Sequence, residues 1–423
     1  EAVASRAMKR ALLGLSLLLS ACAGAPSPAP DAPPTEEASP ARAPALTLVE
    51  SWPRETTLDH TALPDAVDVW PALIGEARES LDLLFFYAVT EEGEALEPVL
   101  TALAEAAQRG VRVRMVFDAA FHARMPEVPD QLGAIEGVDV RVLDFGPHAG
   151  GGVQHAKLFV VDGEAAYVGS QNLDWRSLTE IQELGVLVRE PALVGAVADV
   201  FEMDWALAGG ASLEEARALG TPRRFPVEVD YEGEAARVWP VFSPQPALPE
   251  GAEWDWPRLE AALASAEREI RLQVMGYHLV GHGGDTWRDL DDALRAAAGR
   301  GVRVQLMVSH WETRPGRIED LKALHQVDGV EVRVVTIPEA STGFVPYSRT
   351  IHAKYLTVDG ALSWVGTSNA AGDYFLHSRN AGFVVEGGSF ARRLEAFFDD
   401  LWGSDYAEAV DPARAYEPPR VSE

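Results

Sequence analysis

The sequence predicts an α/β fold of two tandem, pseudo-symmetric domains, each a mixed sheet flanked by helices, with one active site at their interface. The 423 residues are 47% hydrophobic and 24% charged, as is ordinary for a globular protein of two or three domains. Near-continuous apolar strands alternate with helices, which is typical of a sheet covered on both faces. A segment around His155 recurs around His352, 197 residues later, and this repeat indicates a duplicated domain.

The helices and strands of the first half follow from apolar periodicity and from residues that end helices. We expect a helix over residues 72–79 and a Leu- and Phe-rich strand over 80–87. An Ala-rich helix over 98–108 ends before Gly110, and a second apolar strand follows over 111–117. Ligands of such sheets bind beyond the carboxyl ends of the strands, so side chains that follow these strands are candidate site residues.

The second half repeats this order. The pattern predicts helices over residues 259–267 and 290–298. It predicts apolar strands over 270–275 and 302–308. The two halves therefore provide the same elements in the same sequence, as expected of a duplication.

Net charge and cysteine content exclude several classes of protein. The chain carries 36 Lys+Arg and 65 Asp+Glu, which gives a net charge of −29. Proteins that coat DNA non-specifically need cations to neutralise phosphates, so this class is excluded, whereas a small basic pocket for one phosphate is not. Cys22 is the only cysteine, which excludes a disulfide framework and a Cys-based zinc site.

The first residues predict export. Lys9 and Arg10 precede an apolar run over 11–21, and Cys22 follows it, as in a secretory signal. At about 1.5 Å per residue, this run is too short to cross a hydrocarbon core of roughly 30 Å. Residues 19–22 resemble the bacterial lipoprotein box, which implies that Cys22 receives a lipid; ordinary cleavage after a small residue is the alternative.

The chain is expected to divide into five segments. They are a signal peptide with lipobox over 1–22, an Ala- and Pro-rich linker over 23–46, a first domain over 47–220, a second domain over 221–415 and a tail over 416–423. The linker is an extended spacer that holds the folded body away from a membrane. We therefore expect an exported bacterial lipoprotein, anchored in the periplasm or at the cell surface, and at the outer membrane in particular.

Both copies of the repeat fit the pattern His-x-Lys-x4-Asp-x6-Gly-x2-Asn. The two sets are His155, Lys157, Asp162, Gly169 and Asn172, and His352, Lys354, Asp359, Gly366 and Asn369. Five fixed positions give roughly a one in ten thousand chance of a single copy in a chain of this length. Two matched copies therefore indicate a functional site rather than an exposed polar face of a strand.

The spacing of the motif brings cations and amides to one pocket wall. His and Lys at i and i+2 of a strand point to the same face. Gly169 and Gly366 allow the turn that follows to approach closely, and Asn172 and Asn369 add neutral donors. The halves together supply two imidazoles, two ammoniums and two amides. This set suits a phosphodiester, because one imidazole attacks phosphorus while the other protonates the leaving oxygen.

The paired pattern is similar to that of the phospholipase D superfamily. The resemblance implies a phosphohistidine intermediate, which water or another alcohol resolves. Lys157 and Lys354 would stabilise charge on the equatorial oxygens, together with Asn172 and Asn369. The resemblance implies no metal and no cofactor, and the sequence has none of the usual His/carboxylate metal motifs.

One difference between the copies suggests separate roles for the histidines. Glu183 lies eleven residues after Asn172, and the shift places Asn380 opposite it. Within the superfamily the acid at this position orients the motif histidine, so we expect Glu183 to hold His155 as the nucleophile, with His352 as the general acid. His352 would then lack a carboxylate partner, which predicts an acid-shifted activity optimum.

Other residues have a functional and a structural interpretation. Asp162 and Asp359 directly precede glycines, so a role in a turn competes with a catalytic one. Ser170 and Thr367 follow the motif glycines as supporting positions. Candidate substrate contacts are the aromatic residues Tyr87, Tyr277, Trp311 and Tyr347. For the two tyrosines matched between the halves, Tyr87 and Tyr277, packing as buried aromatic residues is the alternative.

The sequence segments that flank the motifs show a more detailed resemblance. Residues 169–179 (GSQNLDWRSLT), 183–186, 346–349 and 366–375 are similar to the animal lysosomal phospholipase D-like proteins, and the similarity extends over about 47–405. It implies a 5′-exonuclease of single-stranded DNA and RNA, or an enzyme of lipid phosphoryl transfer. The animal proteins carry disulfides and a transmembrane anchor, and this chain departs from them in both respects.

Three functions from different classes follow. The first is an exonuclease whose partner is single-stranded nucleic acid. The second is a phospholipase D or phosphatidyltransferase, like cardiolipin synthase, acting on phospholipid at the membrane to which the chain is tethered. The third is a non-catalytic, surface-tethered binding protein, which the two intact motifs disfavour. An exposed apolar rim would favour lipid, whereas an Arg-lined groove with aromatic walls would favour nucleic acid.

Overall fold

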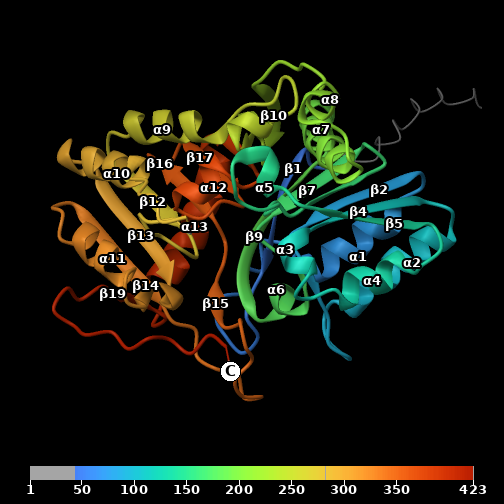
Figure 1. Cartoon of the computed structure of the whole chain (residues 1–423). Helices are drawn as coiled ribbons and strands as arrows, with labels where there is room; N and C mark the ends of the chain where they lie inside the picture. Colours follow the sequence, from blue (N-terminus) through green and yellow to red (C-terminus); the bar gives the residue numbers. More distant parts are fainter. Residues whose placement is uncertain (1–42, 282, 423) are drawn as a thin grey trace, which may run out of the picture. The chain divides into compact units, whose positions relative to one another are not determined.

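The computed structural model describes residues 43–281 and 283–422 (Figure 1). These residues belong to one compact unit, Ala43–Glu423, that contains both predicted domains. The predicted signal peptide with Cys22, and nearly all of the linker, lie outside the described residues, so the lipoprotein signal and its location stay predictions. Among the described helices, none combines the length and the apolar character that crossing a membrane requires.

The first sheet is mixed, as predicted, and contains the first copy of the motif. Its strands are β1 (Leu46–Ser51), β9 (Ile181–Val188), β7 (Ala165–Gly169), β6 (Leu158–Val161), β2 (Ser80–Phe85), β4 (Arg112–Asp118) and β5 (Val138–Leu143), in this spatial order. β2, β4 and β5 run parallel, whereas the other neighbours are antiparallel. A short strand of the second half, β15 (Thr350–Ile351), adds to this sheet by pairing with β9.

The second sheet repeats this order around the second copy of the motif. Its strands are β10 (Val227–Tyr231), β11 (Glu234–Ser243), β18 (Asn380–Glu386), β17 (Leu362–Gly366), β16 (Tyr355–Val358), β12 (Glu269–Gln273), β13 (Arg303–Ser309), β14 (Val330–Val335) and β19 (Ala407–Ala409). The run β18-β17-β16-β12-β13-β14 matches β9-β7-β6-β2-β4-β5. A separate short pair is formed by β3 (Ala88–Val89) and β8 (Leu173–Asp174).

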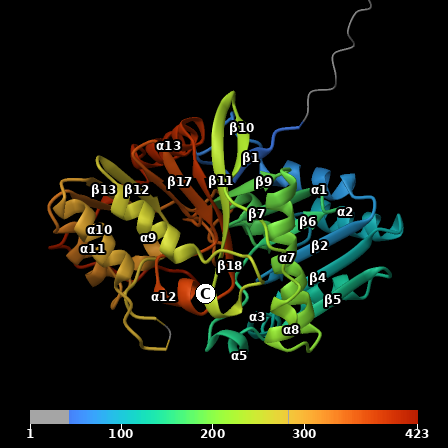
Figure 2. The same cartoon turned by 90° about the horizontal axis from the view of Figure 1, so that it is seen from above.

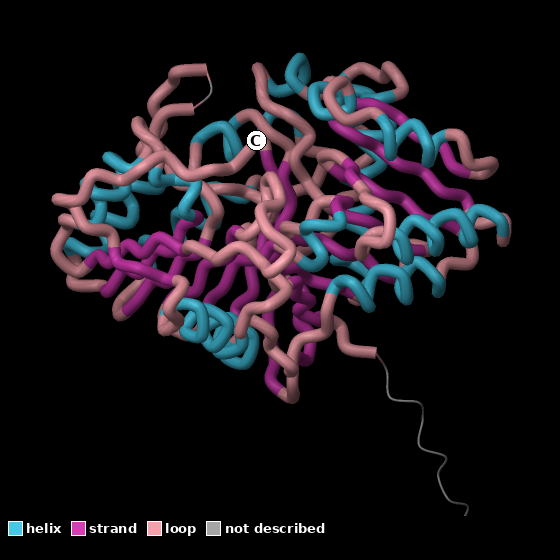
Figure 3. The backbone as a smooth tube through the Cα atoms, turned by 90° about the horizontal axis from the view of Figure 1, so that it is seen from below, coloured by secondary structure: helices cyan, strands magenta, loops and turns pink. Residues whose placement is uncertain are grey.

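Helices lie on both sides of the strands (Figure 3). The longer ones are α1 (Ala66–Glu76), α2 (Glu97–Gln108), α7 (Pro191–Ala208), α9 (Asp255–Ser265), α10 (Asp289–Gly299) and α13 (Gly388–Trp402). The shorter ones are α3 (Ala119–His122), α4 (Glu127–Gly133), α5 (Gly146–Ala149), α6 (Trp175–Thr179), α8 (Leu213–Arg217), α11 (Ile318–His325) and α12 (Gly372–Leu376), with 3-10 turns η1 (Gln245–Ala247) and η2 (His310–Thr313). α7 packs on the first sheet, and α13 packs on the second (Figure 2).

The two halves share one central hydrophobic core. Neighbouring residues of β2 show the arrangement: Leu83 packs in an outer core with α1 and α2, while Leu84 packs in the central core with α7. The same central core contains Phe383 of β18 and Phe398 of α13, both from the second half. The second half has its own outer core with α9, α10 and α11. Because apolar contacts of the central core come from both halves, neither half buries its inner face alone.

The predicted elements of both halves are confirmed, and the largest difference lies in α1. The helix predicted over 72–79 begins six residues earlier, at Ala66, and contains Pro71. Proline removes a backbone donor from a helix interior. Burial of Trp70, which is 1% exposed, fixes the turn before Pro71 against the outer core, and this packing outweighs the local penalty.

A buried ion pair joins the halves beside the motif. Arg379, just before β18, donates to the carboxylate of Asp204 on α7, and both side chains are fully buried. The Arg379 backbone also accepts from the His155 N–H at 3.0 Å and donates to the Val153 carbonyl at 2.9 Å. The pair therefore fixes the chain on which the first motif begins.

We expect Asp204→Ala to lower the free energy of unfolding by about 3–5 kcal/mol, because it leaves the Arg379 guanidinium buried without its counter-ion. Urea unfolding measures this difference. As the matched control, Glu386→Ala removes the partner of Arg237 from an exposed pair, where the side chains are 51% and 48% exposed, and we expect about 1 kcal/mol or less. Equal losses in the two variants would contradict a stabilising role for the buried pair.

Candidate active site

Each copy of the motif begins by pairing with the other half of the chain. The His155 N–H donates to the Arg379 carbonyl at 3.0 Å, and the His352 N–H donates to the Gln182 carbonyl at 2.7 Å. The two contacts are equivalent under the 197-residue shift. The parallel pairing of β15 with β9 continues the second contact, with Ile351 opposite Gln182. The backbone therefore brings both histidines to the junction of the halves.

The side-chain partners of the histidines also cross between the halves, which corrects the predicted pairing. Glu183 does not hold His155: its Oε2 lies 2.7 Å from Nδ1 of His352. Nδ1 of His155 lies 2.9 Å from Oδ1 of Asn380. The 197-residue shift identifies the counterpart of each residue in the other half. It does not show that the first residues of β9 and β18 face the motif of the other half.

Both histidines hold a proton on Nδ1 and leave Nε2 free. The Glu183 carboxylate only accepts, so Nδ1 of His352 is the donor. The Asn380 amide is oriented by its Nδ2, which donates to the carbonyls of Tyr374 at 2.8 Å and Ser378 at 3.2 Å. Its Oδ1 therefore accepts from His155. In the neutral form each Nε2 carries a lone pair, as a nucleophile or a proton acceptor requires.

Burial and neighbouring cations disfavour charge on both imidazoles. Burial lowers the pKa of His155 well below its ordinary value, and the ammoniums of Lys157 and Lys354 lower it further. Burial also lowers the pKa of His352, to about 4, although the Glu183 carboxylate opposes the shift. Burial alone would raise the pKa of Glu183, but His352 and Lys354 hold this carboxyl below its ordinary value. The site thus contains an ionised Glu183 and neutral imidazoles near pH 7.

The two motif lysines are fully buried behind the histidines. The ammonium of Lys157 donates to the carbonyl of His155, and that of Lys354 donates to the carbonyl of His352. Burial lowers the pKa of Lys157 well below its ordinary value, helped by the charge of Lys354. Burial lowers the pKa of Lys354 to about 7. A bound anion would favour the charged form of both lysines, because it offsets the cost of burying their charge.

The motif glycines make room for an aromatic side chain. Gly169 pairs with Gly185 across β7 and β9, and a Cβ on Gly185 would lie 2.1 Å from the Tyr167 hydroxyl. In the second half Gly366 pairs with Gly382, and a Cβ on Gly366 would lie 2.6 Å from the Trp364 ring. The close approach predicted for these glycines is therefore to a neighbouring side chain on the same strand.

The supporting hydroxyls tie the motif to the strand that carries the histidine partner. Ser170 Oγ donates to the Leu184 carbonyl at 3.1 Å and accepts from its N–H at 3.0 Å. Thr367 Oγ1 donates to Oδ1 of Asn380 at 2.8 Å and accepts from the Ala381 N–H at 3.1 Å. Thr367 therefore bonds the partner of His155 directly, while Ser170 fixes the backbone next to Glu183, the partner of His352.

The motif aspartates have a structural role at the far end of the strand from the histidines. Asp162 accepts from the backbone N–H groups of Arg78, Glu79 and Ser80 at 2.8–2.9 Å. Asp359 makes the equivalent three bonds with residues 267–269. Burial alone would raise the pKa of each carboxyl, but the three backbone donors together hold it below the ordinary value. Of the two interpretations left open, the structure supports the turn.

A cavity of about 490 Å³ contains both histidines and both motif asparagines. Its remaining lining is mainly aromatic and apolar, and comprises Phe86, Tyr87, Phe121, Arg124, Met125, Arg176, Ile181, Met275, Trp311, Tyr347, Thr350 and Tyr374. Oδ1 of Asn172 is buried without a hydrogen-bond partner among the described residues, whereas Oδ1 of Asn369 accepts from the Gly276 N–H at 3.2 Å. The two amides therefore differ in the hydrogen bonding of their Oδ1 atoms.

Three of the four predicted aromatic contacts line this cavity, and Tyr277 does not. Tyr277 is 1% exposed and its hydroxyl donates to Asp291 at 2.6 Å. The match of Tyr87 with Tyr277 was wrong by one residue, because Phe86 and Met275 occupy equivalent hydrogen-bonded positions after their strands. The position equivalent to Tyr87 is therefore Gly276. Tyr277 is a packed core aromatic.

Two aromatic residues beside His155 were missed from the sequence. The His155 ring lies between Phe86, at a centroid distance of 5.0 Å, and Tyr374, at 4.9 Å. Their counterparts in the other half are Met275 and Ser177. The position of Phe86 directly after a strand was the available signal. Because its counterpart Met275 is not aromatic, this signal did not indicate a contact with the His155 ring.

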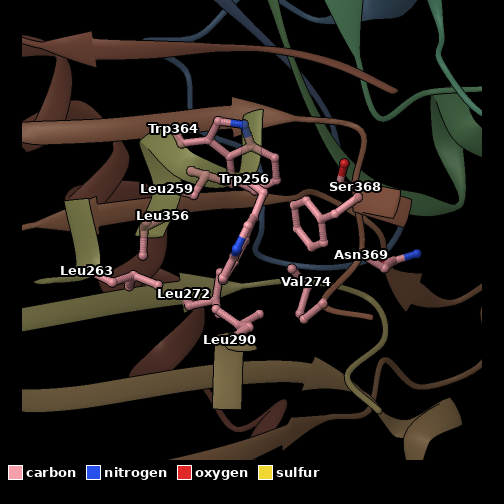
Figure 4. A pocket seen from close by; sticks show the side chains of 12 residues that line it. Trp256, Leu259, Leu263, Leu272, Val274, Leu290, Leu356, Trp364, Ser368 and Asn369 are labelled. Atoms are coloured by element: carbon pink, nitrogen blue, oxygen red, sulfur yellow. The ribbon is translucent and has the colours of Figure 1, made fainter. Parts of the chain in front are cut away.

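A second, smaller cavity behind Asn369 is not a substrate site. It holds about 20 Å³, which is close to the space of one water. Figure 4 shows Trp256, Leu272 and Trp364 around it, with Asn369 at its edge. Its walls are apolar except for Ser368 and Asn369, and it belongs to the outer core of the second half.

The comparisons with known proteins agree across both halves. Residues 71–205 and 259–402 match the family model described as "Cardiolipin synthase, PLD-like domain". The chain is 32% identical to Phospholipase D Z of Dictyostelium discoideum, over 81% of this chain and 86% of that protein. It is 31% identical to the 5'-3' exonuclease PLD3 of Bos taurus, over 86% of this chain and 81% of that protein.

The fold also resembles a solved structure at low sequence identity. The phosphatidylserine synthase of Haemophilus influenzae superposes with a TM-score of 0.58 at 12% identity, over 81% of this chain and 85% of that chain. At this identity the likeness concerns the fold.

We expect Asp162→Ala to lower the free energy of unfolding by about 1–2 kcal/mol, since three backbone donors lose their acceptor. The rate of phosphodiester hydrolysis, divided by the concentration of folded protein, should stay within about twofold of that of the unmodified chain. Because the pKa of Asp162 is lowered in the fold, its stabilising contribution is present above the unfolded pKa and is lost as pH falls through the folded pKa. Urea unfolding at pH 7 and pH 3 measures both effects, with the exposed neighbour variant Glu164→Ala as the control. A large loss of kcat without a loss of stability would instead support a catalytic Asp162.

Proposed function

Since the chain belongs to the phospholipase D superfamily and is one of its phosphodiesterases, we propose that it removes nucleotides from the 5′ end of single-stranded nucleic acid. The observation that carries this choice is the aromatic wall of the catalytic cavity. The similarity of the chain to proteins named 5'-3' exonuclease supports nucleic acid as the substrate and cleavage from the 5′ end.

The aromatic side chains offer stacking surfaces for bases. Tyr87 and Phe121 stack with an interplanar angle of 20° at 5.7 Å on one wall. Trp311 and Tyr347 meet edge to face at 6.4 Å on another, and Tyr347 is 50% exposed. Stacking of a base on an aromatic ring contributes about 1–3 kcal/mol and tolerates any base sequence. This arrangement suits a strand end that is held without sequence readout.

The lipid alternative is less well supported. A phospholipase acting at a bilayer is expected to surround its active site with exposed apolar side chains. The large hydrophobic residues that are exposed in the described chain are Val142, Leu219, Val280 and Tyr347. Only Tyr347 lines the catalytic cavity. The lipid anchor predicted at Cys22 remains part of our proposal as a tether, independent of the substrate.

The crossing of the partners assigns the histidine roles in our proposal. His352, whose Nδ1–H is held by the Glu183 carboxylate, is the nucleophile, because the carboxylate stabilises the positive charge that develops on the ring. Its Nε2 forms a bond to phosphorus while the bond from phosphorus to the 5′ oxygen breaks. His155 in its imidazolium form, with a proton on each ring nitrogen, gives the Nε2 proton to that oxygen and becomes neutral. Water then attacks phosphorus, His155 takes up its proton and the N–P bond breaks.

The lysines and asparagines act on the non-bridging oxygens. A bound phosphodiester anion offsets the burial that lowers the pKa of Lys157 and Lys354, so both are charged ammoniums in the complex. Asn172 Nδ2 and Asn369 Nδ2 are neutral donors on the same wall. Of the described residues, the one group of three acids or histidines close enough to share a metal ion is Glu50, Asp59 and Asp65, and none of these lines the cavity.

We expect the chain lacking residues 1–42 to shorten a single-stranded oligonucleotide stepwise from its 5′ end in EDTA, and to release no choline from phosphatidylcholine vesicles. His155→Ala and His352→Ala should each lower oligonucleotide hydrolysis by at least about 10³-fold. Gel electrophoresis of 3′-labelled strands measures the shortening.

Choline release without shortening would move the protein to the lipid class. Loss of both activities in EDTA and recovery with a divalent cation would contradict the metal-free mechanism. The exposed variant Glu164→Ala, outside the cavity, is the control for folding and handling.

We expect an acid-shifted optimum for the oligonucleotide. The general acid His155 must be protonated, and its lowered pKa means that the protonated fraction falls as pH rises above that value. The nucleophile His352 must be neutral, so activity is lost below its pKa of about 4. A p-nitrophenyl phosphodiester has a leaving group that needs no proton, so its kcat, which reports the complex in which the bound anion keeps both lysines charged, should stay flat on the alkaline side.

The two histidine variants separate the roles. His155→Ala should keep the first-turnover burst of p-nitrophenol within about tenfold, because that step needs no proton from His155, but it should lose steady-state turnover, while His352→Ala should abolish the burst. The reverse result, or an alkaline optimum with the oligonucleotide, would contradict this assignment. Rates from pH 4 to 8 with both substrates provide the measurement.

A further inference from the structure

A second cleft adjoins the catalytic cavity on the side of His155. It holds about 510 Å³. It shares Phe86, Phe121, Arg124, His155 and Tyr374 with the catalytic cavity. Its own walls comprise Ala120, Gly150, Gly151, Gly152, Val153, Gly283, Asp285, Asp373, His377 and Ser378. His352 lines the first cavity and not this cleft.

This arrangement gives the two sides of the scissile phosphate different spaces. In an in-line displacement the nucleophile and the leaving oxygen lie on opposite sides of phosphorus. With His352 as the nucleophile, the leaving oxygen is next to His155, its proton donor. The space that His155 lines and His352 does not is the second cleft. The group that departs therefore extends into it.

The floor of the cleft is bare backbone. Gly150, Gly151 and Gly152 are consecutive, and all have positive φ values, of 71°, 125° and 77°. A Cβ on Gly152 would lie 2.3 Å from the carbonyl oxygen of His377. The His377 backbone therefore excludes a side chain at this position, and the three glycines contribute only backbone atoms to the wall of the cleft.

Arg124 is the cation available to a ligand where the two spaces meet. Its side chain is exposed and its guanidinium lies 5.5 Å from the centroid of Phe121. Among the described residues no carboxylate pairs with it. The other arginine of the catalytic cavity, Arg176, is held by Asp174 at 2.6 Å. In a chain of net charge −29, an unpaired guanidinium at this junction is suited to a second anion.

We propose that the second cleft holds the departing strand, and that Arg124 binds the phosphate that follows the scissile one. The proposal rests on the proposed function and on His352 as its nucleophile. It makes the preferred substrate a diester with a further phosphate on the leaving side, which a nucleic acid chain has and a phosphatidylcholine lacks. The carboxylate of Asp285, which also lines the cleft, repels that phosphate and so favours its position at Arg124.

The test compares two substrates that differ by one phosphate. A dinucleoside monophosphate offers the scissile diester alone, and the same dinucleotide with a 3′-phosphate adds the phosphate that would reach Arg124. We expect the unmodified chain to prefer the second substrate by about tenfold in kcat/KM. Arg124→Ala should reduce this preference to about twofold or less, by slowing hydrolysis of the second substrate more than that of the first. Arg124→Lys should keep part of it.

Salt dependence gives a second readout on a longer oligonucleotide. Loss of one phosphate contact should reduce the slope of log KM against log salt by about 0.7 in Arg124→Ala. Arg112→Ala is the matched control, because Arg112 is an exposed arginine at the start of β4 and its side chain is 58% exposed. It should change neither the slope nor the preference.

The outcomes distinguish the two proposals. If the unmodified chain cleaves neither dinucleotide, the proposed function fails, and the leaving-strand site fails with it. If the unmodified chain cleaves both at equal rates, or if Arg124→Ala keeps the full preference, the phosphodiesterase stands and the leaving-strand site is overturned. An equal loss on both substrates would make Arg124 a general contact rather than a reader of the second phosphate.

Discussion

Each motif histidine is held by a side chain from the opposite half of the chain, and the rest of the site depends on this exchange. His352 is bonded to Glu183 and His155 to Asn380. The backbone makes the same exchange through Gln182 and Arg379. A displacement of one sheet relative to the other would therefore misorient both imidazoles together. The shared central core and the buried ion pair of Arg379 with Asp204 oppose such a displacement.

The second constraint is the burial of four basic groups around one point. His155, Lys157, His352 and Lys354 are each at most 8% exposed, and the carboxylates that act on them are those of Glu183 and Asp118. Burial lowers the pKa of all four. A phosphodiester would supply negative charge that offsets the burial of these groups. Recognition of the anion and activation of the basic groups are the same event.

Much of this protein could be predicted from its sequence. The mixed sheets and the duplicated motif follow from local patterns, because apolar strands and i, i+2 spacing are set by neighbouring residues. The pairing of Glu183 with His352 could not be predicted, since it depends on how one half is placed against the other. Tyr374 beside His155 was missed for the same reason, because it comes from the other half of the chain. The offset between Tyr87 and Tyr277 arose because equal residue types were matched where strand register decides the equivalence.

The inequality of Glu183 and Asn380 has a consequence for how such a site can diverge. Two identical copies of one half, assembled as a symmetric dimer, would carry the same residue at both positions, so their histidines would be interchangeable by symmetry. Fusion into one chain removes that equivalence and lets a single substitution act on one histidine alone. The division of labour between a carboxylate-bound and an amide-bound imidazole is therefore accessible to a tandem protein and closed to a symmetric dimer of identical halves. In this chain, covalent linkage of the halves is what permits each active-site position to evolve separately.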